Sequence, residues 1–336
     1  MAEKTPNQQL AEKLLFKPAY VGDKSAAVKQ EAHAFAEGYK KFLDAGKTER
    51  EVAAESEQML KNAGYQQFDP KKTYAPGDKV YFSQLGKAIV ASTIGTRSFE
   101  DGFHLVIAHT DSPRLDLRPT PLYESDHFSY FKTHYYGGIR KYQWVTIPLE
   151  LHGVVALRDG ASVQVNIGGG ADDPRLVITD LLPHLGAEQN KKPLAEAIPA
   201  ETLNLLLGSE PIGDAEESGR VKLAVMKLLN EKYGITEDDF TSAELEAVPA
   251  VKATDIGLDR SMIGAYGHDD RVCAYAALRA LLDLEGTPAK TAVCVLADKE
   301  EIGSEGVTGM KSAAFDTFME DLCQSQNVPL RACYER

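Results

Sequence analysis

An apolar run of strand length, Thr291–Ala297, ends abruptly in an acidic cluster that contains Asp298, Glu300 and Glu301. A continuous apolar run is typical of a strand buried on both faces, as in a sheet that helices cover. In such sheets, ligands bind where the strands end at their carboxyl edge. Two adjacent glutamates repel each other there unless a cation or a shared proton stabilises the pair. The stretch therefore predicts either a cation site at a sheet edge or a solvated acidic loop.

Two further stretches favour the cation site. The apolar run Phe103–Ala108 has the same layout and ends in His109 and Asp111. Asp269 stands shortly before a helical pattern at residues 272–284. Imidazole and carboxylate groups are ligands that suit zinc, cobalt or manganese. Strand ends and helix starts rich in these groups together predict the two-metal site of a hydrolase.

These motifs resemble those of the aspartyl aminopeptidase family (metallopeptidase family 18), whose members are di-metal aminopeptidases. The resemblance rests on His109-Thr110-Asp111-Ser112-Pro113, on the Asp269-Asp270 pair before a helix, and on Asp298-Lys299-Glu300-Glu301. Weaker similarity lies in Tyr136-Gly137-Gly138-Ile139, in Leu182-Pro183-His184-Leu185 and in Glu244–Ala250. The similarity runs in order from the first predicted helices to about residue 315. It implies a zinc-aminopeptidase-like catalytic core.

The predicted fold class is α/β, with a mixed, mostly parallel sheet that carries helices on both faces. Residues 1–115 and 255–336 are expected to form this catalytic core. Between them, prolines and glycines punctuate short β-type segments, which indicates an inserted small β domain at residues 116–254. In the resembling family, a β domain at this place builds subunit contacts. The resemblance therefore implies an oligomerisation domain and a homo-oligomer such as a dodecamer.

Each candidate site residue has an expected role. Asp269 is the candidate bridge between two metal ions, because its two oxygens can reach both at a separation of about 3.5–4 Å. His109 would complete the coordination of one ion and Glu301 that of the other, with zinc expected and cobalt or manganese as alternatives. Glu300 is the candidate general base that takes a proton from water. Asp111 is expected to fix the orientation of the His109 imidazole.

His184 is a separate candidate. By resemblance to the family's Pro-His-Leu segment, it is expected to enter the active site of a neighbouring subunit and to contact the substrate. The alternative is an ordinary surface or interface histidine.

The resemblance implies hydrolysis of the amino-terminal residue of peptides by a metal-activated water, with Glu300 as the base. The family also has an aspartate and a histidine ligand beyond residue 315, whereas the last histidine of this chain is His268. The chain is therefore expected to be truncated at its C-terminus, with activity in doubt. Two alternatives stay open, a non-catalytic truncated subunit of an oligomer and another di-metal amidohydrolase or deacylase.

Charge and composition exclude several other classes of protein. The 336 residues carry a net charge of −13, which argues against nucleic acid or an anionic membrane as a partner. No apolar run reaches the length of about 18 residues that a membrane-spanning helix needs. The cysteines show no CxxC spacing, and the polar start of the chain lacks the apolar core of a signal peptide. A reduced, cytoplasmic protein is therefore expected.

Overall fold

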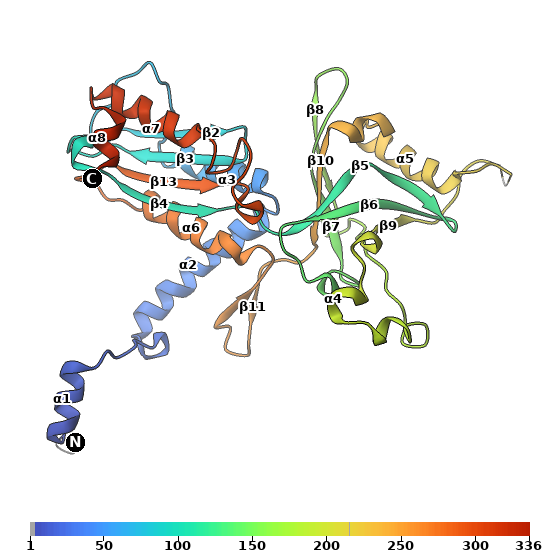
Figure 1. The fold of residues 1–336 in the computed structure, drawn as a ribbon, viewed down its shortest axis with the longest axis horizontal. Coiled ribbons are helices and arrows are strands. Elements are labelled where there is room, and N and C mark those ends of the chain that lie inside the picture. Colours follow the sequence, from blue (N-terminus) through green and yellow to red (C-terminus); the bar gives the residue numbers. More distant parts are fainter. Residues whose placement is uncertain (1–3, 215) are drawn as a thin grey trace. The chain divides into compact units, whose positions relative to one another are not determined.

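The computed structural model describes residues 4–214 and 216–336 (Figure 1). The chain divides into two compact units between Tyr39 and Lys40. The first unit holds helix α1 (Pro6–Leu14) and the start of helix α2 (Ala26–Ala45). Helix α1 begins after Thr5 because the Thr5 and Gln8 side chains each accept a hydrogen bond from the other residue's main-chain N–H, which forms a capping box. Nowhere in the described ranges is there a helix with the length and apolarity of a membrane span.

A five-stranded sheet forms one part of the second unit. Its order is β1 (Gln66–Gln67), β2 (Lys79–Gln84), β3 (Ala88–Thr93), β13 (Ala292–Ala297) and β4 (His104–His109). The predicted α/β class with a mixed sheet is confirmed, but the sheet is not mostly parallel as expected. Parallel and antiparallel pairs are equal in number, because the short turn at Leu85 and Gly86 folds β2 and β3 into a hairpin and β3 also pairs antiparallel with β13.

Helices cover both faces of this sheet, as expected. Side chains alternate along β13, so that Val293 and Val295 pack against Phe318 and Leu322 of helix α7 (Ala314–Ser325). Helix α8 (Leu330–Tyr334) packs beside α7. Helix α6 (His268–Leu282) contacts β4 and β13 from the other side (Figure 1). Helix α3 (Glu49–Asn62) packs against β2 and β3.

A six-stranded antiparallel sheet occupies the middle of the sequence. Its order is β8 (Ser162–Ile167), β7 (Leu149–Ala156), β10 (Ala243–Pro249), β5 (Arg114–Ser125), β6 (Phe128–Tyr136) and β9 (Leu205–Gly208). Its apolar core includes Leu115, Phe131 and Leu151, together with Leu229 of helix α5 (Arg220–Tyr233). The structure also contains the short helix α4 (Leu194–Ala197) and the hairpin of β11 (Thr254–Ile256) and β12 (Met262–Gly264). The division into domains at residues 116–254, with an oligomerisation role, stays a prediction.

A buried histidine connects the six-stranded sheet to helix α3 and gives a test of stability. His152 of β7 is 4% exposed, and its Nδ1 lies 2.7 Å from an Oε1 of Glu51 in α3. Its Nε2 lies 3.5 Å from Glu150 Oε1. Burial acts to lower the pKa of His152, but the two carboxylates more than offset this and raise it to about 9.

A raised pKa means that the His152 contact stabilises the fold fully below the ordinary histidine pKa of 6.5 and that this stabilisation is lost as the pH rises through about 9. The free energy of unfolding should therefore fall on the order of 1–3 kcal/mol more in the wild type than in His152→Gln over this range. Urea unfolding at both ends of the range measures it. The exposed-histidine variant His134→Gln should behave as the wild type. An identical pH dependence in His152→Gln would contradict the assignment.

Candidate metal centre

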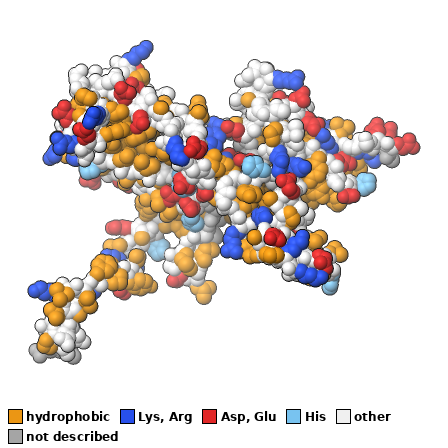
Figure 2. Space-filling view, in the orientation of Figure 1, with side chains coloured by type: hydrophobic (Ala, Val, Ile, Leu, Met, Phe, Trp, Pro, Cys, Tyr) orange, Lys and Arg blue, Asp and Glu red, His pale blue; other side chains and the backbone are white. Residues whose placement is uncertain are grey.

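The parallel pairing of β4 with β13 sets the geometry of the site. The pair places His109, the last residue of β4, opposite Ala297, the last residue of β13. The chain then turns through Asp298 and Lys299 into the short 3-10 helix η7 (Glu300–Ile302). The residues that follow the two strands therefore lie at the same edge of the sheet. Acidic side chains gather on the surface beyond these strand ends (Figure 2).

His109, Glu300 and Glu301 form a compact group of metal-binding side chains. In each of the three, one donor atom lies within 4.8 Å of the others, and they are the one such group in the described part of the chain. The Glu300 carboxylate approaches the Nε2 of His109 to 3.7 Å and is 57% exposed. His109 itself is nearly buried.

Asp269 joins the group from the start of α6. Its Oδ1 lies 3.2 Å from the Nε2 of His109, and the rest of its side chain is open to solvent. The Ser112 hydroxyl donates to the Asp269 carbonyl at 2.9 Å, which fixes the α6 start to the segment after β4. The structure thus brings His109, Asp269, Glu300 and Glu301 together, although 160 residues separate the first two in the sequence. Their individual roles stay predictions.

Asp111 lies behind the group and is fully buried. Its Oδ1 lies 3.3 Å from the Nδ1 of His109, which is also 2.9 Å from the Asp111 carbonyl. The main-chain N–H groups of Glu300 and Glu301 donate to its two carboxylate oxygens at 3.2 and 3.1 Å. With Nδ1 donating to Asp111, the Nε2 of His109 faces Asp269 and Glu300 as a potential ligand atom.

The charges of these groups influence one another. Burial acts to raise the pKa of Asp111, but the hydrogen bonds from His109, Tyr136 and the Glu301 main chain outweigh it, so that its pKa is lowered. Burial acts to lower the pKa of His109, but Asp111 and Glu300 raise it to about 9. Burial and the nearby Asp269 carboxylate raise the pKa of Glu301. The cluster is therefore rich in negative charge that a cation would stabilise.

The donor set fits a divalent transition metal. One imidazole nitrogen and three carboxylates converge from β4, η7 and α6, and these are ligand types that zinc takes. A buried carboxylate also holds the imidazole from behind, as is usual for histidines that bind metal. Asp298, the remaining acid of the motif, points inward instead. It is fully buried and accepts hydrogen bonds from the Thr308 hydroxyl and the Lys299 N–H.

Tyr136 and Gly137 also reach this site, and only a weak motif similarity pointed to them. The Tyr136 hydroxyl donates to Asp111 Oδ2 at 2.7 Å. A side chain at Gly137 would meet the Cβ and Oε2 of Glu301 at 3.1 Å. The Tyr136-Gly137-Gly138 motif marked the segment, but nothing in its spacing connected it with Asp111. His184 lies on an exposed stretch after β8, outside the cluster.

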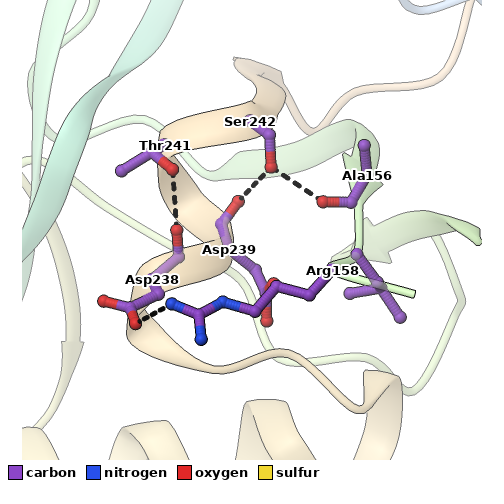
Figure 3. A pocket seen from close by; sticks show the side chains of 7 residues that line it. Ala156, Arg158, Asp238, Asp239, Thr241 and Ser242 are labelled. Carbon is purple, nitrogen blue, oxygen red and sulfur yellow. Dashed lines mark hydrogen bonds and ion pairs between the residues drawn. The ribbon is translucent and has the colours of Figure 1, made fainter. Parts of the chain in front are cut away.

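A pocket of about 440 Å³ beside β7 and the 3-10 helix η6 (Glu237–Ser242) is a different feature (Figure 3). Arg158 pairs there with Asp238 at 2.6 Å. The Thr241 hydroxyl donates to the Asp238 carbonyl, and the Ser242 hydroxyl donates to the carbonyls of Ala156 and Asp239. Because these polar groups already satisfy one another, the pocket is not a candidate active site.

Comparison with known proteins places these features in context. The sequence model of the family described as "Aminopeptidase I zinc metalloprotease (M18)" matches residues 42–330. The "Probable M18 family aminopeptidase 1" of Borrelia garinii subsp. bavariensis is 47% identical over 289 residues, which cover 86% of this chain and 63% of that protein. The protein of the same description from Thermotoga maritima is 45% identical over 302 residues, which cover 89% of this chain and 65% of that protein. The chain thus spans slightly less than two thirds of the length of these relatives.

Solved structures show the same similarity in three dimensions. The crystal structure of an M18 family aminopeptidase from Thermotoga maritima matches with a TM-score of 0.83 and 44% identity, over 89% of this chain and 65% of that one. Aminopeptidase I from Clostridium acetobutylicum matches with a TM-score of 0.87 and 41% identity, over 95% of this chain and 71% of that one.

Proposed function

The chain belongs to the M18 family of aminopeptidase I zinc metalloproteases, and from this membership we propose that it removes the amino-terminal residue of peptides by metal-dependent hydrolysis. The observation that carries the proposal is the meeting of His109, Asp269, Glu300 and Glu301 at one edge of the five-stranded sheet. These residues come from three separate stretches of the sequence, and the fold gives them a common site.

Two divalent cations, zinc by preference, are proposed to bind here. Asp269 would contribute to both ions, His109 to one and Glu301 to the other. Bound cations of this kind lower the pKa of water and polarise the carbonyl of the scissile amide. The distance of 3.2 Å between His109 Nε2 and Asp269 Oδ1 supports the binding of one ion by both side chains.

Glu300 is the proposed general base. Its carboxylate is 57% exposed, so it can approach a water and a substrate that arrive from solvent. Its main chain is held by the hydrogen bond from its N–H to Asp111, which limits where the carboxylate can move. Glu301 is less exposed and lies against Gly137, which supports a ligand role for Glu301 and the proton-transfer role for its neighbour.

A homo-oligomer is also proposed, with the predicted domain at residues 116–254 forming subunit contacts. The structure of the S. cerevisiae protein mApe1, which shares the fold at a TM-score of 0.69 and 19% identity, is described as a dodecamer. In such an assembly, His184 would contribute to the active site of a neighbouring subunit. Its exposed position is compatible with that role.

Metal removal and a substrate panel test this function. The chain is freed of metal with a chelator, reloaded with zinc, and offered aminoacyl-p-nitroanilides with free amino groups and their N-acetylated counterparts. Zinc-dependent cleavage of the free-amine substrates alone is expected, with loss of activity in the chelator. Cleavage of the N-acetylated substrates in their place would identify a deacylase, and absence of zinc-dependent cleavage would contradict the proposal.

A further inference from the structure

The end of strand β6 reaches the candidate metal centre although it belongs to the other sheet. Tyr136 is the last residue of β6, and its side chain is 7% exposed. Its hydroxyl donates to Asp111 Oδ2 at 2.7 Å, which is the shortest of the polar contacts that Asp111's carboxylate makes. Buried carboxylates with several donors have a fixed orientation, because each lost donor leaves an acceptor without a partner.

Asp111 connects the two strand ends that supply the ligands. One of its oxygens lies near the Nδ1 of His109 and accepts from the Glu300 main chain, and the other accepts from the Glu301 main chain and from Tyr136. A rotation of the Asp111 carboxylate would therefore disturb the imidazole and the η7 backbone together. Among these partners of Asp111, Tyr136 supplies the one side-chain hydroxyl, and its hydrogen bond opposes such a rotation.

The Tyr136 ring is itself held in place. The guanidinium carbon of Arg114 lies 3.6 Å from the centre of the ring. Arg114 is 3% exposed and pairs with Glu49 of α3 at 3.3 Å and with Glu246 of β10 at 3.2 Å. A cation over an aromatic face is attracted to it, and the attraction is larger where both groups are shielded from water. The buried ion pairs thus support the tyrosine from behind.

Gly137, the next residue, leaves space for a ligand. Its φ of +69° is in the left-handed region that glycine adopts most readily. A Cβ at this position would lie 3.1 Å from both Cβ and Oε2 of Glu301. The absence of a side chain at residue 137 therefore allows the Glu301 carboxylate to take its observed position.

We propose that the end of β6 is part of the metal centre, with Tyr136 as a positioning residue that acts through Asp111 and Gly137 as the position that admits Glu301. The inference rests on the proposed metal-dependent function. The six-stranded sheet would then contribute to the metal centre of its own subunit, in addition to any role in subunit contacts.

Zinc affinity of the metal-free chain, measured by competition with a chromophoric chelator, tests this proposal. Tyr136→Phe removes only the hydroxyl and should weaken zinc binding by about 10–100-fold, the range for lost outer hydrogen-bond partners of metal ligands. Tyr135→Phe is the matched control, because Tyr135 is the adjacent residue of β6 and is 43% exposed. Its zinc affinity should equal that of the wild type.

The thermal midpoint of the metal-free proteins separates positioning from a structural role. If the Tyr136 hydroxyl has only a structural role, Tyr136→Phe will have a lower thermal midpoint and an unchanged zinc affinity in the folded protein. That result would overturn the inference. If Tyr136→Phe does not fold, Gly137→Ala decides, since its methyl group would displace Glu301 and should also weaken zinc binding about 10-fold or more. Unchanged affinity in Gly137→Ala would then overturn the inference. A wild-type chain that binds no zinc would instead contradict the proposed metal centre itself.

Discussion

Replacing Glu300 with glutamine is expected to lower kcat for peptide hydrolysis by about 10²–10⁴-fold, the usual contribution of a general base. Glutamine keeps the size of the side chain and the main-chain hydrogen bond to Asp111. It cannot accept the proton of the attacking water. Zinc content should stay at the wild-type value, because the proposal assigns His109, Asp269 and Glu301 to the metal. Steady-state kinetics together with metal analysis of the same preparations measure both quantities.

Glu305→Gln is the matched control for this variant. Glu305 lies in the same loop after β13, is exposed, and pairs with Lys311 at 2.8 Å. Its replacement should leave kcat within about twofold, as for surface changes away from a site. If Glu300→Gln loses zinc along with activity, Glu300 is a ligand and the division of roles between the two glutamates is wrong. The test is needed because Glu300 lies as close to His109 as a ligand would, in one compact group with Glu301.

Replacing His109 with alanine is expected to have the largest effect on metal binding. The variant loses an imidazole that lies 3.2 Å from Asp269 and 3.7 Å from Glu300, and it leaves Asp111 buried without its histidine partner. Zinc affinity should fall by more than the roughly 10–100-fold that accompanies the loss of an outer partner. Hydrolysis should be lost with it. Isothermal titration with zinc measures the affinity and the number of ions bound.

His134→Ala is the control for this experiment, because His134 is an exposed histidine on β6. It should bind as many zinc ions as the wild type and with the same affinity. Equal zinc binding by His109→Ala and the wild type would show that the imidazole is no ligand.

Strand β13 could be predicted from the sequence because burial leaves a local pattern. The apolar run at residues 291–297 predicts a buried strand, and β13 lies at Ala292–Ala297 between β3 and β4. The similar run before His109 also forms a strand, yet Leu105, Val106 and Ile107 are 38%, 46% and 48% exposed. Strand β4 lies at the edge of the sheet, and position within a sheet depends on pairing that a local pattern does not encode.

The meeting of the candidate site residues was also predictable, since polar residues that follow buried strands are brought to a common edge. His109, Glu300 and Glu301 carry that signal, Asp269 stands at the start of a helix, and all four meet. No comparable sequence signal points to the contact between Tyr136 and Asp111. This contact joins the end of β6 to the segment between β4 and β5 through side chains 25 residues apart. No periodicity or spacing rule connects such positions, so only the folded chain reveals them.

Diffraction from crystals of the chain soaked with zinc, recorded at the zinc absorption edge, tests the central claim most directly. The account predicts anomalous peaks at the edge of the five-stranded sheet, within about 2.0–2.2 Å of His109 Nε2 and of carboxylate oxygens of Asp269 and Glu301. Zinc bound elsewhere with none of these three residues, or no zinc at this edge at saturating concentration, would contradict it.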